Sequence, residues 1–65
     1  MSDPILADMA AQLSRMDGEI KKAETYLSVL EEAGRNVTEQ RARLRAAMVD
    51  REKFVATLRA RGYNA

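Results

Sequence analysis

The feature that most constrains the fold is a stripe of apolar residues in the first half of the chain. Its members alternate spacings of three and four residues without a slip: Leu6, Met9, Leu13, Met16, Ile20, Ala23, Leu27 and Leu30. This is the a/d pattern of a heptad repeat, typical of a helix that buries a narrow apolar stripe against another helix. The stripe continues in the second half at Val37, Leu44, Met48, Val55 and Leu58. We therefore predict an all-α chain in which these positions form the helix–helix seam.

A stop signal followed at once by a start signal divides the stripe at residues 34–36. Gly34 suits the left-handed position after a helix C-terminus, and Asn36 with Glu39 is a variant of the capping box. We predict a single domain, residues 1–65, folded as an antiparallel helical hairpin (a two-helix coiled coil) within a larger helical bundle or assembly. Its helices cover about residues 4–33 and 37–61, joined by a turn at 34–36. The alternative is one uninterrupted helix, because the stripe keeps its phase across the break.

The beginning and the middle of the first predicted helix carry two further signals. Asp3 can cap the helix with its carboxylate, and Pro4 fits the first helical position because its missing N–H has no partner there. Gly18 interrupts the sequence without shifting the heptad phase and falls at an outward position. We therefore predict a continuous helix through Gly18, weakened by about 1 kcal/mol relative to alanine, with a kink at this position as the alternative.

The small size of the chain favours association with other helices. A core formed by 65 residues rarely supplies more than roughly 3–5 kcal/mol, and small domains compensate with disulfides, metals or oligomerisation. The sequence contains neither cysteine nor histidine, which excludes disulfides and thiolate metal sites and removes the commonest metal ligand. We expect no cofactor and no metal, so oligomerisation remains as the source of extra stability.

The two halves of the chain carry opposite charge. Residues 1–34 contain three basic and seven acidic side chains, whereas residues 35–65 contain eight basic and three acidic ones. This pattern favours two helices that lie side by side. The alternative is a basic second helix that meets nucleic acid or an acidic partner.

Pairing the two stripes antiparallel gives a single register in which Leu27 faces Leu44. We expect Leu13, Ile20 and Leu27 to be the most buried residues of the first helix. Arg41 and Arg51 occupy seam positions, so their stems should pack while their charged heads reach carboxylates at the edge. The expected carboxylates are Glu31 for Arg41 and Glu19 for Arg51.

A second stripe on the second predicted helix is a candidate partner-binding face. It again steps by four and three residues: Ala42, Ala46, Val49, Lys53, Ala56, Ala60 and Tyr63. Its members other than Lys53 are the candidate contact residues for a protein partner, either a second copy or a different subunit. The alternative is that these alanines are only good helix formers on the surface.

Chemistry-bearing residues form no catalytic constellation, so we expect no enzyme activity. Hydroxyl side chains have no histidine to activate them, and no glycine-rich phosphate loop is present. The one site-like cluster is a candidate basic patch, Arg41, Arg43 and Arg45, which could contact phosphates. It supports an alternative function as a small Rop-like regulator that binds RNA, DNA or a regulatory protein. That likeness to the plasmid regulator Rop is one of fold only, since no motif is shared.

The preferred function is structural. We expect a non-enzymatic structural or adaptor protein that docks helices as an accessory subunit of a virion, scaffold or multi-protein complex. The sequence has no stretch near the roughly 18 apolar residues of a membrane span and no recognisable secretion signal. We accordingly expect a cytoplasmic or virion location.

Overall fold

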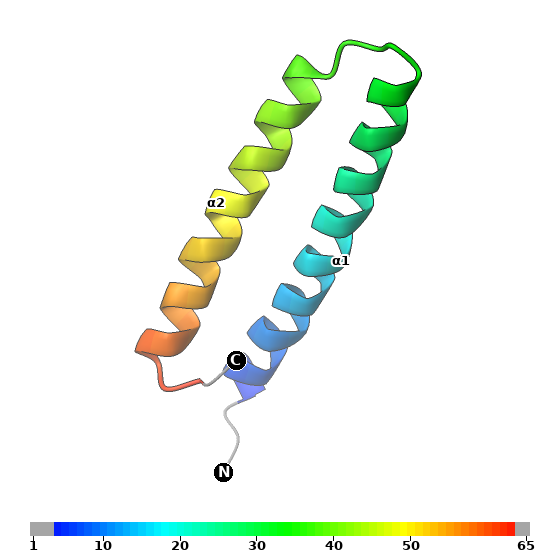
Figure 1. The fold of residues 1–65 in the computed structure, drawn as a ribbon. Helices are drawn as coiled ribbons and strands as arrows, with labels where there is room; N and C mark the ends of the chain where they lie inside the picture. The colour runs from blue at the N-terminus through cyan, green and yellow to red at the C-terminus, as the bar shows by residue number, and fades with distance from the viewer. Residues whose placement is uncertain (1–3, 64–65) are drawn as a thin grey trace.

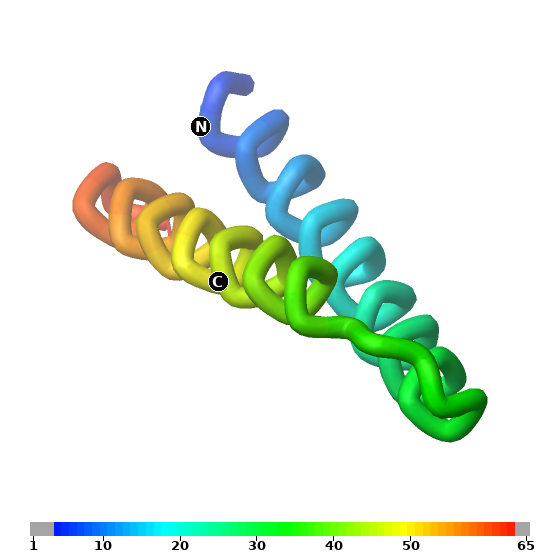
Figure 2. Tube along the Cα trace, turned by 90° about the horizontal axis from the view of Figure 1, so that it is seen from above, coloured from blue at the N-terminus to red at the C-terminus, as the bar shows by residue number. Residues whose placement is uncertain are grey.

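The chain folds into two antiparallel helices joined by a short turn (Figure 1). The computed structural model describes residues 4–63, and the predicted cap at Asp3 lies outside them. Helix α1 spans Pro4–Glu32 and helix α2 spans Thr38–Ala60. The pair forms a rod of 51 × 15 × 14 Å, and Figure 2 shows that the helices cross at an angle. The predicted all-α helical hairpin is confirmed, and the alternative of one uninterrupted helix is wrong.

Helix α1 continues through Gly18 without a break. Gly18 lies on the exposed side of the helix, and a Cβ added there would meet no atom within 4 Å. The surrounding turns therefore hold the helix together despite the low helix propensity of glycine.

The turn is built from two local hydrogen-bonding motifs. Gly34 adopts a φ of 76°, its N–H donates to the carbonyl of Glu31 at 2.9 Å, and Arg35 N–H donates to the carbonyl of Leu30 at 2.9 Å. These two bonds make a Schellman motif, which ends α1. The Asn36 side-chain oxygen then accepts hydrogen bonds from the Thr38 N–H at 3.0 Å and the Thr38 hydroxyl at 2.7 Å. Asn36 thus satisfies a free N–H in the first turn of α2.

The predicted capping box between Asn36 and Glu39 does not form, because Asn36 bonds Thr38 and Val37 takes the N-cap position. Glu39 instead accepts a hydrogen bond from Arg43 at 2.7 Å, one helical turn further on. A charge-assisted contact with a guanidinium is stronger than one with a neutral N–H, which explains the choice of partner. Helix α2 begins at Thr38, one residue later than expected, and Val37 packs in the interior at its start.

The best-packed part of the seam lies at the open end of the hairpin. Leu58 is completely buried and forms a cluster with Leu13 and Val55. Tyr63 packs on this cluster because a second Schellman motif, with Gly62 at φ 91°, turns the chain back over the helix end.

The middle of the seam is more open than the sequence predicts. Leu13 and Leu27 are buried, but Ile20 is only half-buried, and Met48 retains 46% of its exposed surface. Two helices can enclose only the side chains directly between them, so both flanks of the central seam stay open. Ile20 consequently borders a groove on each side of the hairpin.

Two ion pairs join the helices along one side of the seam. Arg41 binds Glu31, as expected, whereas Arg51 binds Asp17 and not Glu19. Asp17 and Glu19 are two residues apart and therefore point about 200° from each other around the helix, so only one can face Arg51. Glu19 instead lies 3.7 Å from Lys22. Hydrogen bonding to the Asp17 carboxylate, and then its charge, raises the pKa of the Arg51 guanidinium above its ordinary value.

Candidate helix-docking surface

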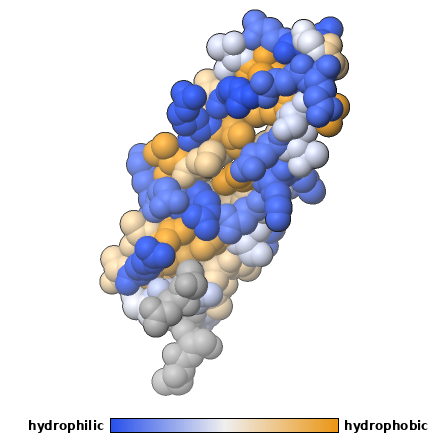
Figure 3. Space-filling view, viewed as in Figure 1, coloured by the Kyte–Doolittle hydropathy of each residue, from blue (hydrophilic) through white to orange (hydrophobic). Residues whose placement is uncertain are grey.

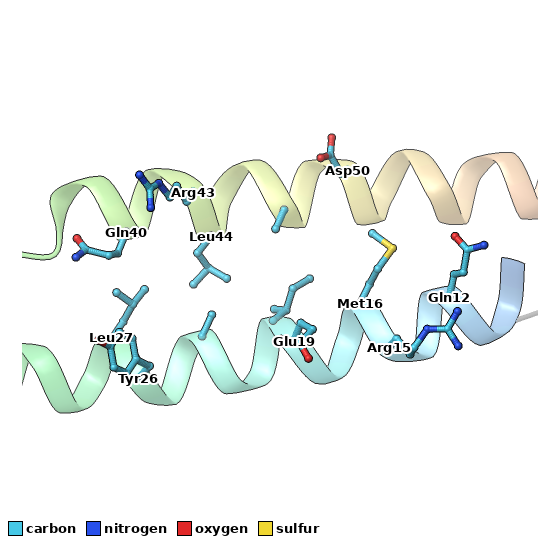
Figure 4. Close-up of a pocket in the computed structure, with 13 residues that line it drawn as sticks. Gln12, Arg15, Met16, Glu19, Tyr26, Leu27, Gln40, Arg43, Leu44 and Asp50 are labelled. Carbon is cyan, nitrogen blue, oxygen red and sulfur yellow. The ribbon is translucent and has the colours of Figure 1, made fainter.

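An apolar groove of about 720 Å³ lies between the two helices (Figure 4). We call it the Tyr26 groove; it is lined by Gln12, Arg15, Met16, Glu19, Ile20, Ala23, Tyr26, Leu27, Gln40, Arg43, Leu44, Ala47 and Asp50. Both helices contribute to it along several turns. In Figure 4, Leu27 and Leu44 point toward each other from the two helices. The groove is therefore the open flank of the central seam.

Seam side chains make the floor of the Tyr26 groove, and exposed apolar side chains extend it along α1. Tyr26 is 61% exposed, and Val29, three residues further on, is 56% exposed. Ile5 is also exposed and lies three heptads before Tyr26, which places it at the same heptad position. On α2, Ala47 and Phe54 occupy the corresponding position next to the seam, and both are half-buried. This side of the hairpin thus carries apolar residues beside the a/d seam, interrupted on α1 by the polar Gln12 and Glu19 at the same heptad position as Ile5 and Tyr26.

The opposite flank has a different character. Its groove, about 460 Å³, is the Met48 groove, lined by Asp17, Ile20, Glu24, Arg45, Met48, Val49, Arg51 and Glu52. Five of these eight residues are charged, and the ion pair between Arg51 and Asp17 crosses this side. Figure 3 shows the hairpin from the opposite side to Figure 4. On this side, hydrophilic residues lie over the hydrophobic residues between the helices. Charged side chains therefore make up most of the lining of this flank.

The predicted partner-binding face on α2 is separate from the Tyr26 groove. Its members Ala42, Ala46, Val49, Ala56 and Ala60 are all exposed. Val49 borders the Met48 groove, so this stripe runs along the outer and charged side of α2. Tyr63 does not belong to it, because the turn at Gly62 packs Tyr63 onto the core cluster.

The structure does not bring the candidate basic patch together. Arg41 binds Glu31 across the hairpin, and Arg43 binds Glu39 at 2.7 Å. Arg43 lines the Tyr26 groove, whereas Arg45 lines the Met48 groove. The three guanidinium groups therefore face different directions, and two of them already have carboxylate partners.

The Tyr26 groove escaped the sequence analysis, although the sequence carries a signal for it. In both helices, one heptad position immediately precedes a seam residue and lies on the flank of the Tyr26 groove. Its apolar members are Ile5 and Tyr26 in α1 and Ala47 and Phe54 in α2. Reading these flanking positions together with the seam would have revealed a three-position stripe. Such a stripe is typical of a helix that contacts two neighbours and not one.

The described residues offer little else that resembles a site. Within residues 4–63, no three carboxylates lie close enough together to hold a metal ion. Neither described helix has a segment long and apolar enough to cross a lipid bilayer. No protein-family model, curated protein or solved structure matches the chain. The Tyr26 groove is therefore the feature on which a functional proposal can be built.

Proposed function

We propose that this protein is a non-enzymatic structural or adaptor subunit that docks helices within a larger assembly through the Tyr26 groove. The observation that carries the proposal is the apolar groove itself, flanked by exposed Tyr26 and Val29. Contiguous exposed apolar surface with a polar rim marks a contact site in small proteins. Polar side chains such as Gln12 and Gln40 supply that rim here.

Shape and chemistry both suit a helix as the bound element. The groove runs along the seam and has an apolar floor of Met16, Leu27 and Leu44. A helix that lays its apolar face into such a groove completes a bundle and removes the floor from water. Covering Tyr26, which is 61% exposed in the single hairpin, contributes about 1–2 kcal/mol, a large part of what a core of this size supplies.

The Rop-like alternative has weaker support. A nucleic-acid-binding surface needs several cations on one face, and the cations at Arg43 and Arg45 lie on opposite flanks of the hairpin. We therefore keep the structural function as the proposal.

The test is the native mass of the tagged protein in cell extracts, compared among wild type and two variants. Tyr26→Glu places a charge at the groove, and Val49→Glu places the same charge on the outer side of α2, where Val49 is 49% exposed. We expect wild type and Val49→Glu to migrate as a multi-chain assembly and Tyr26→Glu to be lost from it. A tagged wild-type protein that migrates with the mass of a single free chain would overturn the proposal. So would loss of assembly in Val49→Glu alone.

A further inference from the structure

We propose that a second copy of this chain occupies the Tyr26 groove and forms a four-helix bundle with both turns at the same end. The inference rests on the proposed function, because it names the partner that the groove docks. Two hairpins can stack groove to groove with two-fold symmetry in two ways. With the turns at the same end, α1 of one copy lies on α2 of the other. With the turns at opposite ends, each helix lies on its own counterpart.

The net charges of the helices select the first arrangement. Helix α1 contains six acidic and three basic residues, whereas α2 contains three acidic and six basic residues. Placing α1 on α2 of the second copy brings opposite charges together on both sides of the bundle. Placing each helix on its counterpart brings like charges together on both sides, which is destabilising. The two helices of one chain are therefore complementary in net charge, and the charged residues that line the groove, Arg15 and Glu19 on α1 and Arg43 and Asp50 on α2, supply one group of each sign per helix.

Individual side chains at the groove edge agree with this arrangement. Lys22 is seven residues after Arg15 and therefore shares its side of α1, while Asp50 lines the groove from α2. Since Leu27 faces Leu44, Lys22 and Asp50 stand at nearly the same height along the rod. In the proposed bundle, Lys22 meets Asp50 of the second copy, and two-fold symmetry forms this contact twice.

Arg43 and Tyr26 form the second complementary pair. Both line the groove at nearly the same height, one from each helix. Stacking the copies places the Arg43 guanidinium of one against the Tyr26 ring of the other, a geometry suited to cation–π contact. The contact also covers the most exposed aromatic ring of the described residues.

The orientation can be measured by electron–electron distance between spin labels at Arg35→Cys. The natural chain has no cysteine, and Arg35 is exposed in the turn, so each copy carries one label. The proposed bundle predicts one short distance, about 20 Å or two helix diameters. Turns at opposite ends would give a distance near the 51 Å length of the rod and overturn the orientation. An absence of dipolar coupling would show a monomer and overturn the second copy as occupant.

A charge exchange tests the same contact independently. Lys22→Glu should weaken dimerisation about tenfold, because two symmetric attractions become repulsions. Adding Asp50→Lys should restore wild-type affinity only if the two positions meet across the copies. Lys21→Glu is the matched control: it makes the same charge change on the neighbouring position, which points away from the groove. Equal weakening by Lys21→Glu, or no rescue by the double variant, would overturn the proposed pairing.

The two proposals fail in different ways. A purified chain that stays monomeric, together with a Tyr26-dependent assembly in extracts, would mean that a different protein fills the groove. That result overturns the second copy and leaves the docking function intact. A chain that is monomeric in both settings overturns both.

Discussion

Replacing two glycines by alanine should change stability in opposite directions. Gly18 lies in the exposed middle of α1, and Gly34 ends the helix in the left-handed conformation with φ 76°. An added Cβ meets no atom within 4 Å at either position. The substitutions therefore differ in backbone conformation and not in steric contact, and neither residue lines the Tyr26 groove.

The expected magnitudes follow from the backbone alone. Gly18→Ala should raise the free energy of unfolding by about 1 kcal/mol, the difference in helix propensity between the two residues. At Gly34, the left-handed conformation costs an L-residue about 1–2 kcal/mol. The reduced entropy of the unfolded chain offsets about 0.4–1 kcal/mol of that cost. Gly34→Ala should therefore lower the free energy of unfolding by about 1 kcal/mol.

The assay is urea denaturation followed by circular dichroism at one fixed protein concentration, because association makes apparent stability depend on concentration. With a slope of about 1 kcal/mol per molar urea, the two midpoints should move about 1 M in opposite directions. A destabilised Gly18→Ala would refute a regular helix at residue 18. A stabilised Gly34→Ala would refute the left-handed helix stop and favour a helix that runs on through the turn.

Three further predictions concern the core, the turn and the basic residues. Leu58→Ala should cost about 2–5 kcal/mol in unfolding experiments because its side chain is fully buried, whereas Met48→Ala should cost less than about 1 kcal/mol; equal losses would contradict the burial pattern. Asn36→Ala should cost about 1 kcal/mol by removing its two hydrogen bonds to Thr38, and an unchanged denaturation midpoint would argue against that cap. Titration with duplex RNA or DNA at physiological salt should show no binding that depends on Arg43 and Arg45, and steeply salt-dependent binding lost on their replacement would favour the regulator.

The architecture could be predicted from sequence because its determinants are local. The heptad spacing defines which face of each helix is buried. Gly34 and Asn36 mark the turn because both residue types are favoured at helix ends and disfavoured inside helices. The ion pair between Arg41 and Glu31 also followed from the register. These features depend on residues close in sequence or on the pairing of two helices in one register, so the sequence pattern is sufficient to predict them.

The departures occur where packing around the seam decides. Heptad position alone could not reveal that Ile20 and Met48 border open grooves, because exposure depends on how many helices surround the seam. Arg51 binds Asp17 and not Glu19 because the Asp17 carboxylate is the one that points toward Arg51 from α1. Tyr63 lies on the core cluster and not on the predicted partner-binding face of α2, because the backbone turn at Gly62 redirects the chain. Each of these outcomes is set in three dimensions.

Hydroxyl-radical footprinting of the assembled protein tests the central claim most directly, because Tyr26 and Met48 report on opposite flanks. Both side chains react with the radical and both are exposed in the single hairpin, at 61% and 46%. The reference is Val29→Glu, which places a charge beside Tyr26 and should dissociate the assembly. The account predicts that Tyr26 is modified several-fold more slowly in assembled wild type than in Val29→Glu, while Met48 reacts equally in both. Equal modification of Tyr26 in the two proteins, or protection of Met48 alone, would contradict docking through the Tyr26 groove.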